Sequence, residues 1–472
     1  ASGSNKAVIT VAGAASTDSW IADSKENLVA GNGAGAARDA DTCWNVMIGC
    51  NAGNDLNEGD NNVFIGCRAG ELATSGNQNI AIGPNSLGGG VATGDDNVLL
   101  GRYTGGSLTS GVGNIALGRN SGFQLTTTSY NFIGGYSAGD RVRGSSNIIL
   151  GNLAGRGSAT PADNTGSHNF IGGYKAGEDI TSGACNILFG VTAGANLTTG
   201  ADNIALGRAA LSAGAVTGGC NIAFGANSGK DITSGEHNIL LGCCAGKSIV
   251  AGGCNIVIGM QAGCAMIGDS NVDDNIIIGR NSGNFLDGST NVIIGKEALV
   301  GNASYSGVSH NIAIGCAALQ CNRGVHNLGL GRNAGSQICD GAYNVLLGGL
   351  SGYSLTTGCC NTMVGFYAGC NLTAGCLNVA IGYNSQVPIL TGSNQLVVGI
   401  NSHLGWINGD SNMNVGIGTT IPTAAVGVGN TAKLSVGILS AYQLYGDGSN
   451  LTNVGAASTD AWIADSQENL VA

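Results

Sequence analysis

A five-residue phrase, Asn followed by three mostly apolar residues and then Gly, recurs along most of this chain. Residues 203–207, Asn-Ile-Ala-Leu-Gly, are a complete example. Successive phrases start 17 residues apart in most cases, and a few longer steps indicate insertions. Seventeen residues are too few for a helix pair or a propeller blade, whereas two or three short strands joined by tight turns fit that length. The repeat therefore predicts an all-β fold, a parallel β-solenoid with coils of about 17 residues.

The glycine and proline contents agree with this fold. Gly ends each apolar triplet and recurs in Ala-Gly and Thr-Gly pairs, where a corner needs a positive φ or a close approach of two backbones. Such corners account for the 84 Gly residues. The 4 Pro residues are as few as expected if most backbone N–H groups donate to ladders between coils.

The repeat Asn has a structural and a functional interpretation. Coils stack about 4.8 Å apart, so the recurring side chains are expected to form an amide ladder at one corner. A column of ligand-binding amides is the alternative, but amides that satisfy the backbone groups of a turn are much commoner. We therefore predict a structural ladder. Its clearest members are Asn45, Asn62, Asn79, Asn114, Asn186, Asn203, Asn221, Asn238, Asn255, Asn344, Asn361 and Asn378.

All three strand residues of the phrase are usually apolar. Side chains alternate between the two faces of a strand, so both faces of this strand are predicted to be buried. A single solenoid has one interior, so the second face needs a partner, most simply the same strand in another copy of the chain. A closed homotrimeric fibre would bury that face. Replacing Ile204 with Asp is expected to disrupt the local core.

The repeat divides the chain into three parts. Residues 1–42 are a connector segment with a motif around Trp20, residues 43–400 form a solenoid of about 21–22 coils, and residues 401–472 are a β-rich connector. The start of the chain returns almost unchanged at its end, so the last part leads into a second copy of the N-terminal motif. We interpret this as a higher-order repeat within a tandem polypeptide. A linker duplicated at both ends of one shaft is the alternative.

The 16 Cys residues are many for a cytosolic chain, and some recur at the coil period. Cys50 and Cys67 follow the strand Gly in neighbouring coils, and Cys359 and Cys376 are also 17 residues apart. Stacked Cα atoms about 4.8 Å apart lie within disulfide range, so both pairs are candidate disulfides between coils. An extracellular or virion-surface location is favoured. A further set precedes the repeat Asn and is placed to bridge chains: Cys185, Cys220, Cys254 and Cys360.

Charge and residue placement argue against several function classes. Charged residues make up 10% of the chain and the net charge is −11, so we expect no nucleic-acid partner. No apolar run approaches the length of a membrane span, so we expect no membrane insertion. The sequence has no CxxC pair and its five His residues look scattered, so we expect no metal site and no cofactor.

The sequence shows no catalytic constellation. No Ser lies between a strand and a helical pattern, which is the context of a nucleophile elbow, and the Gly-rich phrases do not lead into a helix as a phosphate loop must. We therefore predict that the chain is not an enzyme. Paired carboxylates on the flank of a solenoid can process polysaccharides, and that alternative is less favoured. Passage through a eukaryotic secretory route would make four Asn residues candidate glycosylation sites. They are Asn196, Asn302, Asn371 and Asn450.

Two sets of motifs resemble known fibre proteins. Residues 414–422 (NVGIGTTIP), 432–436 (AKLSV) and 445–454 (YGDGSNLTNV) look like connector segments in tail fibres of tailed phages, especially marine ones. The coils, such as NIAIG at 311–315, resemble the NxVAIG-type repeats in head domains of trimeric autotransporter adhesins. The coil here is longer than in those heads. The resemblance implies a homotrimeric fibrous shaft on a virion or cell surface.

The repeat, the apolar strand and the connector predict a non-enzymatic structural fibre shaft for surface attachment or adhesion. The expected partner is the chain itself, as a homo-oligomer, either a trimer or a filament. A cell-surface glycan is a candidate ligand. The alternative function is a self-assembling extracellular filament or matrix protein, built from tandem superrepeats and held by disulfides. A fibre-borne polysaccharide-processing enzyme is less favoured.

Overall fold

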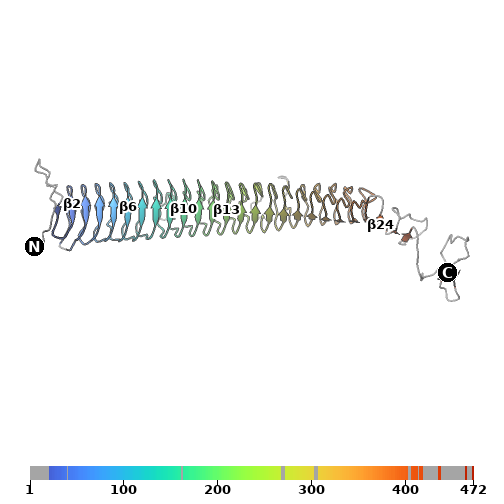
Figure 1. Ribbon diagram of the computed structural model, residues 1–472, viewed down its shortest axis with the longest axis horizontal. Helices are drawn as coiled ribbons and strands as arrows, with labels where there is room; N and C mark the ends of the chain where they lie inside the picture. Colours follow the sequence, from blue (N-terminus) through green and yellow to red (C-terminus); the bar gives the residue numbers. More distant parts are fainter. Residues whose placement is uncertain are drawn as a thin grey trace, which may run out of the picture.

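The chain forms a long rod in which one short strand per coil lies beside the equivalent strand of the next coil (Figure 1). This computed structural model has about 21 turns with coils of about 17 residues, and no helix occurs in the part of the chain that it describes. The predicted all-β parallel β-solenoid is confirmed. The described residues are 21–39, 41–160, 163–266, 272–301, 307–401, 405–412 and 414–417, with the strands at 434–436, 463–464 and 470–471.

The strand stack starts at β2 (Leu28–Ala30) and ends at β23 (Leu396–Gly399), and every pair within it is parallel. In register, Ile204 lies opposite Ile222 and Ala205 opposite Ala223. Since a slip of one residue would exchange the two faces of a strand, constant register keeps each face chemically uniform along the rod. The strands between these ends are β3 (Val46–Ile48), β4 (Val63–Ile65), β5 (Ile80–Ile82), β6 (Val98–Leu100), β7 (Ile115–Leu117), β8 (Phe132–Gly134), β9 (Ile148–Leu150), β10 (Phe170–Gly172), β11 (Ile187–Phe189), β12 (Ile204–Leu206), β13 (Ile222–Phe224), β14 (Ile239–Leu241), β15 (Ile256–Ile258), β16 (Ile276–Ile278), β17 (Val292–Ile294), β18 (Ile312–Ile314), β19 (Leu328–Leu330), β20 (Val345–Leu347), β21 (Thr362–Val364) and β22 (Val379–Ile381).

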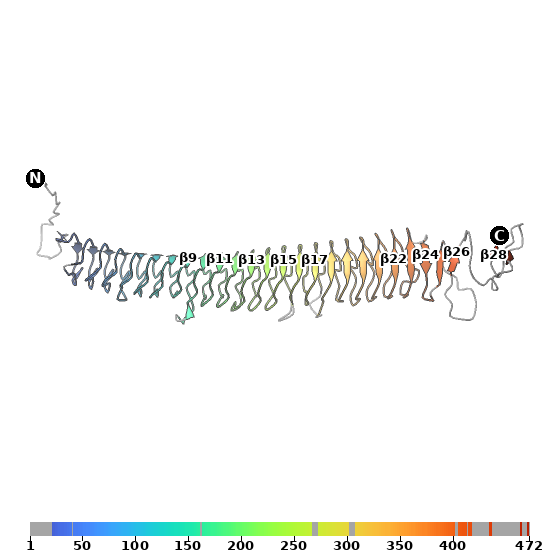
Figure 2. The same ribbon diagram turned by 90° about the horizontal axis from the view of Figure 1, so that it is seen from below.

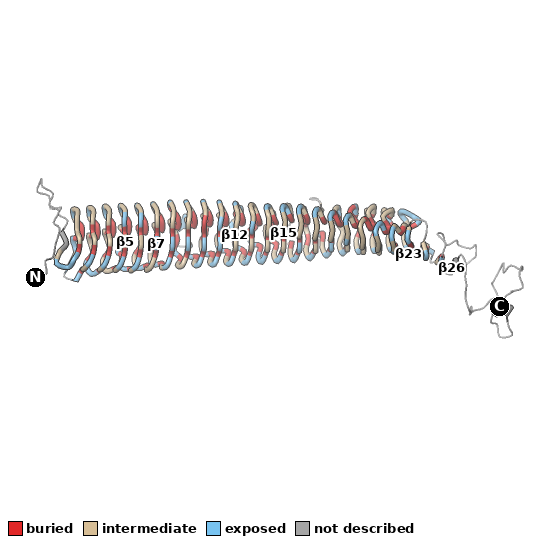
Figure 3. Tube along the Cα trace, viewed as in Figure 1, coloured by how far each residue is buried: buried red, intermediate tan, exposed pale blue. Residues whose placement is uncertain are grey.

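The core is a continuous column of side chains inside the coils, and the middle residue of each strand points into it. Leu188 of β11 is fully buried there, together with Ala193 and Leu197 from the rest of the same coil. Figure 3 shows these buried segments recurring along the whole rod. The expectation that Ile204 belongs to the core is wrong. Ile204 begins β12 on the outer face and is only half-buried, whereas Ala205 beside it is fully buried.

The corner that follows each strand requires glycine for two reasons. Gly207 ends the phrase of β12 with a φ of +138°, which side chains rarely tolerate. A Cβ atom at Gly207 would also lie 2.5 Å from the carbonyl oxygen of Gly225 in the next coil. Stacked corners are thus close enough that the backbone leaves no room for a side chain.

Both ends of the stack depart from parallel pairing. β1 (Ile21–Ala22) pairs antiparallel with β2, and β2 already forms a rung ahead of residue 43. At the other end β24 (Gly405–Gly409) pairs antiparallel with β23 and with β25 (Val415–Ile417), which pairs in parallel with β26 (Leu434–Val436). Figure 2 shows these strands following the regular coils. The change in pairing coincides with the end of the repeat phrase.

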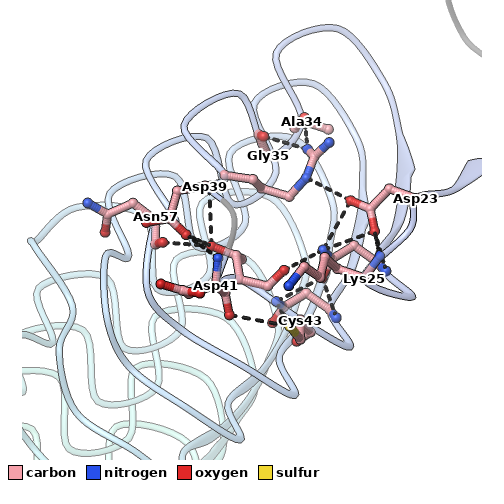
Figure 4. Close-up of polar contacts among 12 residues, drawn as sticks. Asp23, Lys25, Ala34, Gly35, Asp39, Asp41, Cys43 and Asn57 are labelled. Carbon is pink, nitrogen blue, oxygen red and sulfur yellow. Dashed lines mark hydrogen bonds and ion pairs between the residues drawn. The ribbon is translucent and has the colours of Figure 1, made fainter.

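Asp23 caps the first rung of the stack. Its Oδ1 atom accepts hydrogen bonds from the backbone N–H groups of Lys25 and Asn27, both at 3.0 Å, and its Oδ2 accepts one from the Asn27 side chain at 3.1 Å. Figure 4 shows Asp23 and Lys25 in this group of polar contacts. Partial burial raises the pKa of Asp23, but the hydrogen bonds from Asn27 and Lys25 and the charge of Arg38 together outweigh it, so the pKa is lowered overall.

The hairpin at the start of the chain has a counterpart at its end. β27 (Ile463–Ala464) pairs antiparallel with β28 (Leu470–Val471), as β1 does with β2. Ile21 lies opposite Val29 and Ile463 lies opposite Val471, so both hairpins have the same register after a shift of 442 positions (463 minus 21). The strand pairing of this short segment therefore recurs together with its sequence.

Candidate functional site: the outer strand face

The first and third residues of strands β3 to β22 form one surface, which we call the outer strand face. None of these residues is charged, and nearly all are Ile, Val, Leu or Phe. Across coils they touch one another, as in the edge-to-face pair Phe170 and Phe189 with ring centroids 4.9 Å apart. Many of them are exposed to solvent. Those with the largest exposed fractions are Ile82, Leu100, Ile115, Phe132, Ile148, Phe170, Ile187, Phe189, Phe224, Ile276, Ile312, Leu330 and Ile381.

The outer strand face is larger than the apolar patches of ordinary monomers. Three residues at about 3.3 Å each and a coil spacing of about 4.8 Å give about 50 Å² per coil, or about 1,000 Å² over the rod. The largest patch on a typical monomer covers about 300–600 Å². A standard protein–protein interface buries about 800 Å² on each partner, so the outer strand face is large enough to form a stable interface.

The repeat Asn side chains form a hydrogen-bonded ladder inside the corner that precedes each strand. The backbone N–H of Asn203 donates to Oδ1 of Asn186 in the preceding coil at 2.9 Å. Nδ2 of Asn203 donates to the carbonyl oxygen of Gly218 at 3.0 Å, and Oδ1 of Asn203 accepts from Asn221. The hydrogen-bonding groups of these amides are paired within the chain, which favours a structural ladder over a column of ligand-binding amides. The twelve predicted members are each at most 1% exposed: Asn45, Asn62, Asn79, Asn114, Asn186, Asn203, Asn221, Asn238, Asn255, Asn344, Asn361 and Asn378.

The ladder extends beyond the residues predicted for it. Asn27 begins it, with its backbone N–H on Asp23 and its Oδ1 accepting from Asn45. Gln395 ends it, because its backbone N–H donates to Oδ1 of Asn378 at 2.9 Å. A Gln in the Asn position hides this last rung from a search for the repeat phrase.

All 16 cysteines are free thiols, so neither predicted pair is a disulfide in this structure. Cys50 and Cys67 are both exposed on neighbouring coils. The Sγ atoms of Cys359 and Cys376 lie 2.8 Å apart, in direct contact but farther than the bond of about 2.05 Å in a disulfide. That contact, followed by burial, raises the pKa of Cys359 to about 11. Its thiolate is therefore scarce at neutral pH.

The residue directly before each ladder Asn forms a second, exposed column that the sequence interpretation missed. Four of the five His residues lie in it, so the description of them as scattered is wrong. The rings of His310 and His326 stack at 4.8 Å, and His326 stacks on Tyr343 at the same distance. Counting back from each Asn would have revealed the column. Its cysteines are the four placed to bridge chains, Cys185, Cys220, Cys254 and Cys360, and its other histidines are His168 and His237.

Among the described residues, no cluster suited to metal binding occurs, and two of the candidate glycosylation sites have their side-chain nitrogens engaged in hydrogen bonds. No group of three or more His, Cys, Asp or Glu side chains there is arranged to hold a metal ion. The Nδ2 atoms of Asn196 and Asn371 donate to the carbonyl oxygens of Ser212 at 2.7 Å and Val387 at 2.9 Å. A glycan would have to be attached to these same nitrogens. Asn302, Asn450 and the motif around Trp20 lie outside the described residues.

Comparison with known proteins adds no family to this description. No protein-family model matches the chain, and no curated protein is similar to it. Within the described residues, no helix has the length and apolar character needed to cross a bilayer. The surfaces of the rod are therefore the features that bear on its function.

Proposed function

We propose that this chain is a non-enzymatic structural fibre shaft whose copies associate along the outer strand face. The observation that carries the proposal is the uninterrupted, uncharged outer face of β3 to β22. An identical face on a second copy has the same length, width and apolar character, and isologous or cyclic association would cover it. The shaft would supply reach and rigidity for surface attachment or adhesion at a virion or cell surface.

A closed homotrimer is the arrangement we favour. Each strand face is only about 10 Å wide, so three rods around a common axis can turn all three faces inward. The resemblance of the coils to the heads of trimeric adhesins supports the same number. The phage-like connector phrases at 414–422 and 445–454 support the assignment to a fibre.

The test is the mass of the native particle by light scattering, first for the unmodified chain. Three chains per particle are expected. Replacing Ile187, Ile204 and Ile222 together with Asp places three charges on the outer strand face, and the particle is expected to dissociate to single chains. A wild-type particle of one chain would overturn the proposal, as would a triple variant that keeps the wild-type mass.

A matched control separates the outer strand face from exposed apolar surface in general. Tyr130, Val191 and Leu377 are as exposed as the strand residues or more so, but lie outside the strands. Replacing these three with Asp is expected to leave the mass unchanged. Hydrolysis of a polysaccharide by the purified rod would separately refute the non-enzymatic assignment.

A self-assembling filament of tandem superrepeats is the second candidate. The observation in its favour is the hairpin β27–β28, which repeats the register of β1–β2 after 442 positions. An open-ended mass distribution would favour the filament over the closed trimer. Loss of polymer on addition of reductant would show that exposed cysteines such as Cys185 and Cys220 bond between chains.

A further inference from the structure

A hollow of about 280 Å³ opens on the side of the rod between the strand corners and the following turn. It belongs to the segments that follow the strands, so association through the outer strand face does not use its residues. Three successive coils contribute to it. Its lining residues are Tyr103, Asn120, Phe123, Gln124, Asp140 and Arg141.

The hollow has fixed aromatic walls because one coil lacks a side chain. Gly106 occupies the position that Phe123 occupies in the next coil, and a Cβ at Gly106 would lie 2.6 Å from the Phe123 ring. The ring therefore lies over the Gly106 backbone. Tyr103 meets Phe123 edge to face, with centroids 6.2 Å apart at 89°, and the Arg102 guanidinium lies 4.9 Å from the Tyr103 ring centre. These contacts hold both rings in place beside the hollow.

The polar side of the hollow carries an unused acceptor. Asp140 is half-buried, and the structure shows no hydrogen bond or ion pair to its carboxylate among the described residues. Its neighbouring cations are engaged elsewhere, since Arg141 donates to the carbonyl of Gly157 and Arg156 lies 3.5 Å from Glu178. Burial raises the pKa of Asp140, against the opposing effect of the two arginines. A partly desolvated carboxylate of this kind gains from a ligand that donates hydrogen bonds.

The amides of Asn120 and Gln124 complete the polar side. Within the part of the chain that the structure describes, only their backbone N–H groups donate hydrogen bonds, to the carbonyl oxygens of Arg102 at 3.0 Å and Asp140 at 2.8 Å, so their side chains are open to a ligand. An apolar ligand would leave these amides and the carboxylate unpaired. An anionic ligand would face Asp140 on a chain of net charge −11. A neutral ligand with one apolar face and several hydroxyl groups suits both sides.

We propose that this hollow binds one ring of a neutral pyranose polysaccharide. The C–H face of the sugar packs on Phe123 and Tyr103, its hydroxyl groups donate to Asp140, and Asn120 and Gln124 pair with the remaining hydroxyls. Binding at this hollow does not require association of copies, because a single chain supplies every lining residue. Association of several copies would multiply a weak single-site affinity through multivalent contact.

The test uses the full chain and immobilised hexasaccharides of glucose, mannose and galactose, with hexagalacturonate as the anionic comparison. Binding to at least one neutral hexasaccharide and no binding to hexagalacturonate are expected. Phe123→Ala and the isosteric Asp140→Asn are each expected to weaken binding by about tenfold or more, as loss of a stacking wall or a paired acceptor predicts. Tyr353→Ala is the control, because Tyr353 occupies the position of Phe123 in a distant coil.

Three outcomes would overturn the proposal: no neutral hexasaccharide is bound, Asp140→Asn binds as wild type, or Tyr353→Ala weakens binding as much as Phe123→Ala. Circular dichroism melting of each variant shows that a loss of binding is not a loss of fold. Light scattering of the same samples keeps failure of this site apart from failure of the fibre assembly. A trimer without sugar binding would refute the sugar site alone.

Discussion

The two faces of the strand stack are similar in composition and opposite in burial. On β11 the middle residue Leu188 is 0% exposed, while its neighbours Ile187 and Phe189 are 38% and 41% exposed. Folding of the single chain explains why the inner face is apolar, since each coil must bury a side chain to fold. Folding alone does not explain why the outer face is apolar, because polar residues there would leave the core of the coil unchanged. Burial of the outer face is what the proposed association of copies would add.

The free energy available on the outer face is large. Removing about 1,000 Å² of apolar surface from water at about 25 cal/mol per Å² corresponds to about 25 kcal/mol per copy as an upper bound. Association costs several kcal/mol of translational and rotational freedom, which this bound exceeds. The bound therefore leaves a surplus of free energy that favours association through the whole face.

The largest effect is expected from a charge on the inner face. Leu188→Asp buries an unpaired carboxylate in the core column and is expected to cost more than about 4 kcal/mol. In a quasi-one-dimensional fold the damage should stay near the affected coils. Hydrogen exchange should show lost protection around β10 to β12, with the distant coils unchanged. Uniform protection along the whole rod would contradict the assignment of Leu188 to the core.

The next effect concerns the ladder beside the inner face. Asn203→Ala removes the acceptor for the backbone N–H of Asn221 and the donor to the Gly218 carbonyl. Each buried group left unpaired costs about 1–3 kcal/mol, so a loss of about 2–5 kcal/mol is expected in local stability. Asp202→Asn, one residue earlier in the exposed column, keeps a residue type that tolerates the positive φ of 58° there and should stay within about 0.5 kcal/mol. Equal losses in the two variants would refute the structural ladder.

The comparison of the two faces also shows how far the sequence could predict this structure. The period of the Asn phrase predicts the coil length and the strand positions because both repeat together. Alternation along Ile204, Ala205 and Leu206 shows two faces but not which one is inside, since all three residues are apolar. The core position of Ala205 depends on the direction in which the chain turns at Gly207, and that is a property of the whole coil.

Sites built from several coils were harder to predict. The spacing of Cys359 and Cys376 correctly indicates neighbouring thiols, but spacing does not decide between a non-bonded contact and a covalent bond. The hollow beside Phe123 depends on the missing side chain of Gly106 one coil earlier. Such a feature emerges only when the side chains of one coil are compared with those missing from the next coil, and a repeat phrase limited to Asn, the strand and Gly does not include these positions.

A smaller effect on stability is expected from a single charge on the outer face. Ile204→Asp leaves the core side chain Ala205 in place, so the single chain should lose less than about 1 kcal/mol. The same substitution places a charge in the proposed interface, so it should lower the melting temperature of the assembled particle more than that of a dissociated chain. Thermal melting above and below the dissociation concentration measures both. Equal shifts at the two concentrations would show that the outer face is not an interface.

The smallest effect is expected at Asp23, which caps the first rung of the stack. Its pKa is lowered in the folded chain, so ionised Asp23 contributes stability above the usual carboxyl value of 3.8 and loses it as the pH falls through the lowered value. Asp23→Asn keeps an acceptor for Asn27 but loses the charge, so at pH 7 the first rung should lose less than about 1 kcal/mol. The difference between the variant and the wild type should shrink as the pH falls through the lowered pKa of Asp23. Hydrogen exchange of the Asn27 N–H measures the difference, with the exposed Asp96→Asn as control. A difference that does not change with pH would show that the geometry of the cap, rather than its charge, stabilises the end of the rod.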